Sequence, residues 1–270
     1  MNTLARTLRA HWPEVLIEAG GLGLFMISAG VFATLLYSPL SPLGGHLPKG
    51  LLRDALMGLA MGGTAIGLIY SPWGQRSGAH FNPSVTLTFL RLGKIDPADA
   101  LLYVGAQVVG GTLGVVLVRA FFGDAFSAPP VRFVATVPGA PGIGVAFVAE
   151  VAISALLMTA VLWISNSRFA RITGLVAGTL VAFYITFEAP LSGMSMNPAR
   201  SFASALPSGI WTGFWIYLLA PPLGMLLAAE GYRAVRGLSR VYCAKLHHPD
   251  EHRCIFRCRY CESPAAGNPS

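Results

Sequence analysis

The sequence predicts an all-α membrane protein with six transmembrane helices and two re-entrant half-helices arranged as an inverted repeat. Three observations lead to this fold class. Hydrophobic residues make up 54% of the 270 residues and charged residues only 11%, whereas about 25% of a typical soluble protein is charged. Apolar stretches recur at lengths that cross a bilayer. Two shorter apolar stretches begin with related Asn-Pro tripeptides.

Six stretches are long and apolar enough to span a membrane. A hydrocarbon core about 30 Å thick requires about 20 mainly apolar helical residues. The predicted spans cover residues 15–36, 55–73, 100–118, 143–167, 172–187 and 211–229. The first and fourth contain one acid each, Glu18 and Glu150. The fifth extends to about residue 191 if Glu188 sits at the membrane interface.

The basic residues predict the orientation of these spans. Six spans place both termini on one side of the membrane, and 14 of the 19 lysines and arginines fall on that side. The other five are Lys49, Arg53, Arg119, Arg132 and Arg200. Cytoplasmic loops carry the excess of positive charge, so both termini are predicted in the cytoplasm of a cell (inner or plasma) membrane. This distribution suits contact with lipid headgroups, and no nucleic acid is expected as a partner.

Two apolar segments are too short to span and predict half-helices. Residues 81–92 and 196–206 can cross about half of a bilayer. They begin at Asn82-Pro83-Ser84 and Asn197-Pro198-Ala199. Asn is a favoured N-cap and Pro is favoured at the first helical position, so each helix is predicted to start at its Asn.

The same residues indicate an internal repeat. Each Asn-Pro motif follows Ser-Gly at the same spacing, and Glu18 and Glu150 open the leading span of each half. Because each half holds three spans, the second half must insert upside down relative to the first. We therefore expect one half over residues 1–125, the other over 126–236, and a tail over 237–270.

Opposed half-helices would create a particular electrostatic environment. Two helix N-termini that face each other place partial positive charge at the membrane centre. The amides of Asn82 and Asn197 would donate hydrogen bonds to the oxygen of a passing molecule, while cations would be repelled. Glu18 and Glu150 are expected to accept hydrogen bonds from the loop backbones that no helix satisfies. The pattern predicts a pore for neutral solutes.

Residues 77–86 and 192–201, with Arg200 directly after the second Asn-Pro-Ala, resemble the paired signature motifs of the aquaporin, or major intrinsic protein, family. The resemblance covers roughly residues 10–236. It implies a homotetramer with one pore per protomer, and a channel rather than an enzyme. The predicted spans also contain no Cys, and the only His near membrane depth is His80, so no set of nucleophile, base and orienting residue is visible and an intramembrane hydrolase is not expected.

The same resemblance implies a selectivity filter formed by Met61 or Gly62, Ile185, Met194 and Arg200. Water-selective members place a His where this sequence has Ile185. Residues 190–197 look more like the plant nodulin-like branch and its bacterial relatives, which pass larger neutral solutes. We therefore expect a channel for water and small neutral solutes. A strict water channel is the alternative, because the flexible Met194 side chain would narrow the opening.

The tail gathers His and Cys residues that no pore requires. The run from His247-His248 through His252 to Cys261 clusters three imidazoles and three thiols, of which zinc or copper(I) would accept four, and the candidate site consists of His252, Cys254, Cys258 and Cys261. Two alternatives remain open: reduced thiols without metal, and a switch based on thiol oxidation. Apart from this tail, no cofactor is expected. The alternative function from a different class is that of a membrane-anchored metal-sensing or adaptor protein that works through this tail.

Overall fold

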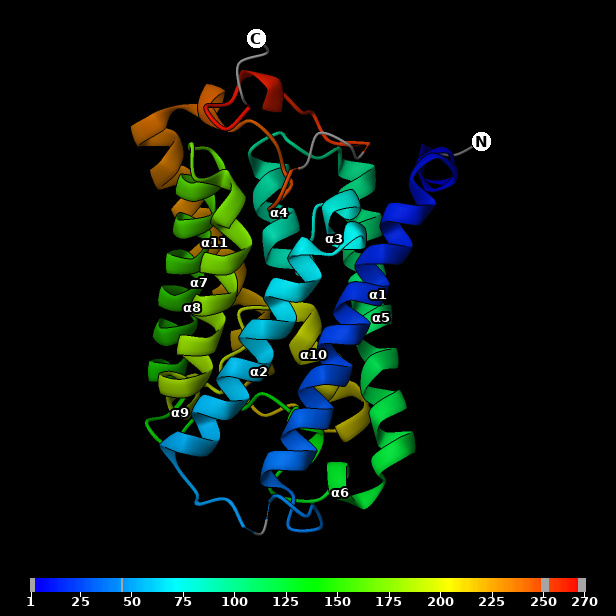
Figure 1. The fold of residues 1–270 in the computed structure, drawn as a ribbon, viewed down its shortest axis with the longest axis vertical. Coiled ribbons are helices and arrows are strands. Elements are labelled where there is room, and N and C mark those ends of the chain that lie inside the picture. Colours follow the sequence, from blue (N-terminus) through cyan, green and yellow to red (C-terminus); the bar gives the residue numbers. More distant parts are fainter. Residues whose placement is uncertain (1–2, 45, 249–252, 267–270) are drawn as a thin grey trace.

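The computed structural model describes residues 3–44, 46–248 and 253–266, and its regular structure is entirely helical over those ranges (Figure 1). Six of the described helices are long and apolar enough to cross a membrane, as the sequence predicts. They are α1 (Thr3–Tyr37), α2 (Leu51–Tyr70), α5 (Pro97–Phe122), α7 (Ile143–Ser165), α8 (Thr173–Phe187) and α11 (Phe214–Arg236). The span formed by α8 includes the preceding 3-10 turn η2 (Ala170–Ile172) and covers Ala170–Phe187. The predicted fold class is thus confirmed.

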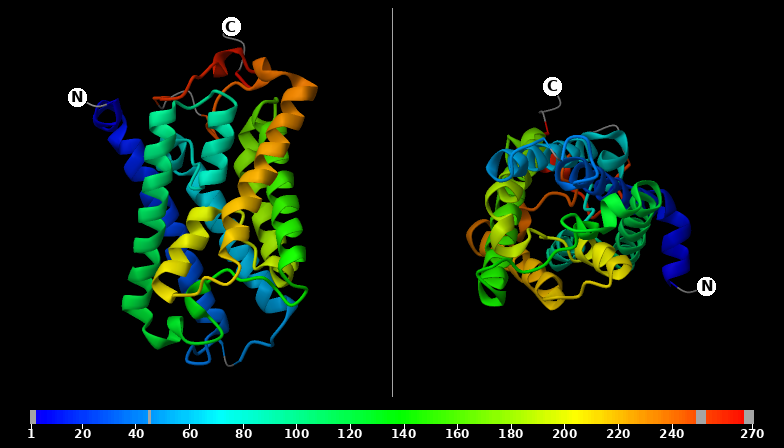
Figure 2. Two further views of the ribbon diagram at one scale, coloured as in Figure 1. Left: turned by 180° about the vertical axis from the view of Figure 1, so that it is seen from behind. Right: turned by 90° about the horizontal axis from the view of Figure 1, so that it is seen from below.

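Two half-helices, α4 (Pro83–Arg91) and α10 (Pro198–Ser208), lie inside this bundle. They approach the centre from opposite ends, as Figures 1 and 2 show. Short helices α3 (Pro72–Ser77) and α9 (Ala189–Ser192) lead into them. The side chain of Asn82 caps α4 by accepting from Ser84 N, and that of Asn197 caps α10 by accepting from Ala199 N and Arg200 N.

Helix α1 is longer than the predicted span because its first residues are helical without being apolar. Hydropathy identifies only the apolar part of a helix. Residues 3–10 are mainly exposed and include Arg6 and Arg9, so they were not assigned to the span. The helix bends at His11, whose backbone is not helical, two residues before Pro13. This N-terminal arm leaves the bundle at the end that also carries the C-terminus (Figure 1). We call that end the termini end.

Close helix contacts depend on glycines. A Cβ atom on Gly110 of α5 would lie 1.9 Å from the carbonyl oxygen of Ala19 in α1. A Cβ atom on Gly62 of α2 would lie 2.5 Å from the carbonyl oxygen of Gly178 in α8. Neither position tolerates a side chain without movement of the backbones. Small residues thus let two helix pairs approach more closely than larger side chains would permit.

The remaining elements close the two ends of the bundle. Helix α6 (Asp124–Ser127) and the 3-10 turn η1 (Arg132–Val134) lie in the connection between α5 and α7. Beyond α11, the tail contains the 3-10 turns η3 (Leu238–Arg240) and η4 (Tyr260–Glu262). The tail folds back across the termini end instead of extending away from it (Figures 1 and 2).

Candidate functional site

A cavity of about 280 Å³ lies between the helices and connects residues from both ends of the bundle. Tyr37 and Asp54 line it at the end opposite the termini, Asn82 and Asn197 line it at the centre, and Leu246 of the tail lines it at the termini end. Much of the remaining lining is aliphatic, from α1, α2, α7 and α8. An apolar passage with a few polar groups is typical of a site for small molecules.

The two asparagines join the half-helices at the centre of the cavity. Asn82 Nδ2 donates to the carbonyl oxygen of Met196 at 2.7 Å, and Asn197 Nδ2 donates to that of Phe81 at 2.8 Å. Their Oδ1 atoms cap the two helices. A side-chain amide has two N–H donors, and these bonds use one of each. The second donor of each residue remains for a molecule in the cavity.

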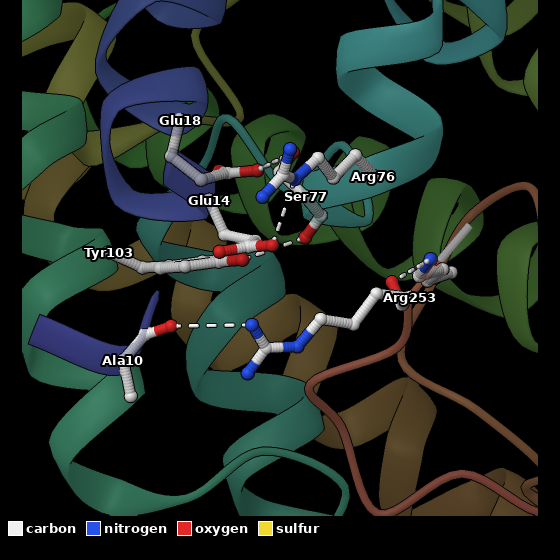
Figure 3. A network of polar contacts seen from close by, with 8 residues as sticks. Ala10, Glu14, Glu18, Arg76, Ser77, Tyr103 and Arg253 are labelled. Carbon is white, nitrogen blue, oxygen red and sulfur yellow. Dashed lines mark hydrogen bonds and ion pairs between the residues drawn. The ribbon is translucent and has the colours of Figure 1, made fainter. Parts of the chain in front are cut away.

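Glu18 holds the loop that precedes α4. Its carboxylate accepts hydrogen bonds from Ser77 Oγ at 2.8 Å, His80 N at 3.1 Å and Phe81 N at 2.6 Å. Gln107 Nε2 of α5 adds a fourth bond at 2.8 Å. The hydroxyl of Tyr103 donates to the carbonyl oxygen of Ser77 (Figure 3). The loop backbone is thus satisfied by side chains from two spans, as an irregular segment inside a membrane requires.

Glu150 does the same for the loop that precedes α10. It accepts from Ser192 Oγ at 2.9 Å, Ser195 N at 2.6 Å and Met196 N at 2.8 Å. The hydroxyl of Tyr217 donates to the carbonyl oxygen of Ser192 at 2.6 Å. Each donor has its counterpart in the first half. The two tyrosines were not predicted from the sequence, although they occupy equivalent positions on α5 and α11 in the two halves of the repeat.

The loops before the two half-helices share an unusual backbone. Phe81 and Met196, which directly precede the two asparagines, both have positive φ angles, 44° and 54°. The left-handed region costs a residue with a side chain about 1–2 kcal/mol. The bonds from their N–H groups to Glu18 and Glu150 hold them there. The two acids therefore fix the conformation that brings the asparagines together.

The residues that the resemblance implied for the filter lie in two environments. Met61, Ile185, Met194 and Arg200 line the cavity. Gly62 instead faces Gly178 and Ala182 of α8. The guanidinium of Arg200 donates a hydrogen bond to Thr136 Oγ1, and Ser201 Oγ donates to the same oxygen at 3.1 Å. Thr136 was not predicted from the sequence, because it lies in a loop without a motif.

The tail brings together a different set of metal-binding side chains from the one that the spacing suggested. Atoms of Cys243, His248, Cys254 and Cys258 lie within 4.8 Å of one another. Cys261 is exposed and stands outside this group, and His252 lies outside the described residues. His248 belongs to the run of His and Cys residues that the sequence singles out, but His252 was selected as the ligand in its place, and Cys243 was missed because it lies outside that run, 11 positions before Cys254.

Electrostatics within this group favour an ionised sulfur. Hydrogen bonds from the thiols of Cys243 and Cys254 hold the pKa of Cys258 well below its usual range. Burial alone would lower the pKa of the His248 imidazole, but hydrogen bonds to Cys254 and Cys258 and their charge raise it to about 9. Thiolates are the form in which cysteine binds metals.

Comparisons with known proteins agree with this geometry. The family described as "Major intrinsic protein" matches residues 11–232. Aquaporin NIP1-2 and Aquaporin NIP1-1 of Arabidopsis thaliana are 36% and 37% identical to the chain over 188 residues, which is 67% of this chain and 63% of each relative. The chain thus matches less than two thirds of the length of these curated relatives.

A solved structure supports the fold independently. The aquaglyceroporin from Plasmodium falciparum superposes with a TM-score of 0.66 over 83% of this chain and 96% of that one, at 20% identity. With its paired half-helices, its central asparagines and the family match over most of its length, the chain belongs to the major intrinsic protein family, that of the aquaporins.

Proposed function

We propose that the protein is a passive membrane channel for water and small neutral solutes. One observation carries this proposal: the amides of Asn82 and Asn197 lie in a mainly apolar cavity at the point where two helix N-termini meet. Each amide keeps one N–H donor for the oxygen of a passing molecule. Permeation of this kind needs no cofactor and no chemical step.

The same arrangement excludes ions and protons. The N-termini of α4 and α10 contribute partial positive charge at the centre, and Arg200 adds a full positive charge to the cavity wall. A cation would lose its hydration shell there without gaining a compensating anion. A water molecule whose oxygen accepts from both asparagines directs its hydrogens away on either side, so a proton wire through the centre is interrupted.

The filter favours small solutes with an apolar face. We assign it to Met61, Ile185, Met194 and Arg200, which all line the cavity, and exclude Gly62 because its α-carbon faces α8. Three apolar side chains and one cation contact a polyol or an uncharged hydroxide well. They offer a water molecule few hydrogen bonds to replace those it leaves behind.

The surroundings of the channel follow from its exterior. Large hydrophobic side chains such as Leu59, Leu101 and Val148 are more than half exposed on the spans, which suits contact with lipid and with neighbouring copies of the chain. We propose a homotetramer with one pore per protomer in the cell membrane. Both termini would face the cytoplasm because the termini end carries most of the basic residues.

Solute uptake by proteoliposomes tests this function. The full chain would carry Leu246→Ala, because Leu246 lines the cavity at the termini end and a shorter side chain there widens the opening. We expect this variant to admit water and at least one of glycerol, urea, hydrogen peroxide or boric acid. In stopped-flow light scattering, the further change Ile185→His should lower solute uptake severalfold relative to water, since it adds a donor and narrows the filter. Water flux with none of these solutes would indicate a strict water channel. Flux equal to that of empty liposomes would contradict the function.

A further inference from the structure

The tail is inserted into the termini end of the cavity. Residues 241–246 are each at most 6% exposed, although they follow the last span and contain Lys245. His80 Nε2 donates to the carbonyl oxygen of Ala244 at 2.9 Å, and Leu246 N donates to the carbonyl oxygen of Gly78 at 3.1 Å. Leu246 also forms part of the cavity wall. The tail therefore directly contacts the loop that precedes α4, which we call the pore loop.

Residues 241–248 form a first arm of the tail, and residues 253–258 form a second arm that packs on the same loop. The ring of Phe256 stacks on His80 at 5.4 Å between centroids, and Phe89 stacks at 5.3 Å. A Cβ atom on Gly78 would lie 2.7 Å from the Phe256 ring. Tyr103, which supports the loop, meets His80 edge-on. Aromatic contacts of this kind contribute beyond their buried area, so His80 is held by the tail as well as by the pore.

Further bonds anchor the tail around the rim of the cavity. Tyr242 N donates to Asn166 Oδ1 at 2.8 Å, beyond the end of α7, and Arg257 N donates to the carbonyl oxygen of Lys94 at 3.0 Å, beyond the end of α4. Arg253 reaches the carbonyl oxygen of Ala10 in α1 at 3.5 Å (Figure 3). The tail thus bridges three separate elements across the opening.

One group of side chains connects the two arms. Cys243 and His248 come from the first arm, and Cys254 and Cys258 from the second. The sulfurs of Cys243 and Cys254 lie 3.5 Å apart, and Cys258 Sγ lies 3.2 Å from His248 Nε2. Zinc–sulfur bonds of about 2.3 Å in a tetrahedron place sulfurs about 3.8 Å apart. The group therefore has the composition and the dimensions of a closed structural zinc site.

The net charge of such a zinc site also fits the lysines around it. Three thiolates around one divalent zinc ion leave a net charge of −1. The ammonium groups of Lys94 and Lys245 are buried and interact electrostatically with these thiols. Lys245 Nζ is also held by the carbonyl oxygen of Arg253 at 3.0 Å. A buried ammonium is costly unless an anion is near, and a zinc–thiolate centre would be that anion.

We propose that Cys243, His248, Cys254 and Cys258 bind one zinc ion, and that this ion holds the tail as a plug over the termini end of the channel. This inference rests on the proposed channel function. The thiol protons pass to solvent when the metal binds. A segment as short as the tail buries too little apolar surface to fold by itself, and metal binding is a common means of stabilising such a unit. Removal of the ion should release the plug and open the channel.

Metal content tests the site without any transport measurement. Full-length protein purified without chelator should retain about one zinc per chain, with three sulfurs and one nitrogen in its X-ray absorption spectrum. Cys243→Ser and Cys258→Ser should lose this zinc, whereas Cys261→Ser, outside the group, should keep it. A metal-free protein after reconstitution with zinc under reducing conditions would overturn the site, as would a Cys243–Cys254 disulfide under those conditions.

Flux tests the plug. In proteoliposomes, a membrane-permeant zinc chelator should raise water and solute flux of the full chain severalfold, and Cys258→Ser should be open from the start. Phe256→Ala should keep its zinc and still leak, because the ion remains while the ring on His80 is lost. Zinc removal that leaves the flux unchanged would overturn the plug. If no variant conducts, the channel function fails, and the zinc content alone decides the site.

Discussion

At the scale of single residues, three buried glutamates differ in the hydrogen bonds that their carboxylates accept. Glu18 and Glu150 each accept several hydrogen bonds from a pore loop. Glu188, only 8% exposed, has no hydrogen-bond partner for either carboxylate oxygen in the described part of the chain. It lies near Ser192, but the single hydroxyl proton of that serine is donated to Glu150. The repeat pattern predicts the first two acids, and no pattern predicts the third.

Replacing Glu150 should therefore destabilise the protein. In Glu150→Gln, an NH2 group replaces one of the two carboxylate oxygens, so either Ser195 N or Met196 N loses its acceptor, and an unsatisfied buried donor costs about 1–3 kcal/mol. We expect a lower unfolding temperature in detergent, measured by circular dichroism. Glu188→Gln is the matched control and should be neutral or stabilising. Equal losses in both variants would contradict the role given to Glu150.

At the scale of elements, the sequence predicts where helices begin more readily than which face they turn inward. The Asn-Pro motifs give the starts of α4 and α10, because capping is a local property of the chain. The inward face of α2 is not local. Met61 and Gly62 are adjacent, and only the packing of α2 on α8 turns Met61 to the cavity and Gly62 to Gly178. Hydropathy alone cannot separate them.

Two neighbouring glycines of α2 test this packing. In Gly62→Ala the new methyl group would lie 2.5 Å from Gly178 O and 2.8 Å from the Ala182 side chain, and overpacking costs about 1–3 kcal/mol. We expect less folded protein in size-exclusion chromatography and a lower unfolding temperature. In Gly63→Ala, no atom from another described part of the chain would lie within 4 Å of the new methyl group, so this change should be neutral or slightly stabilising. The reverse order would show that α2 is rotated relative to this structure.

At the scale of the whole molecule, the membrane part was predictable and the tail was not. Lipid requires every spanning segment to be apolar and internally hydrogen-bonded, so the six spans and both half-helices are evident from composition and length. The tail has no such constraint. Its contacts join residues far apart, such as His80 and Ala244 at a separation of 164 positions, and its metal-binding group skips from Cys243 and His248 to Cys254 and Cys258.

The orientation of the molecule in the membrane decides on which side the tail meets the pore. Both termini lie at one end of the bundle (Figure 1), and 14 of the 19 basic residues belong to that side in the sequence. A green fluorescent protein fused after Ser270 should therefore fluoresce in bacterial cells, and alkaline phosphatase inserted after Gly142 should be active, because these reporters work on opposite sides of the inner membrane. The converse pattern would place the tail outside. That outcome would also weaken the zinc plug, since thiols 3.5 Å apart, as in Cys243 and Cys254, stay reduced in the cytoplasm but are oxidised beyond it.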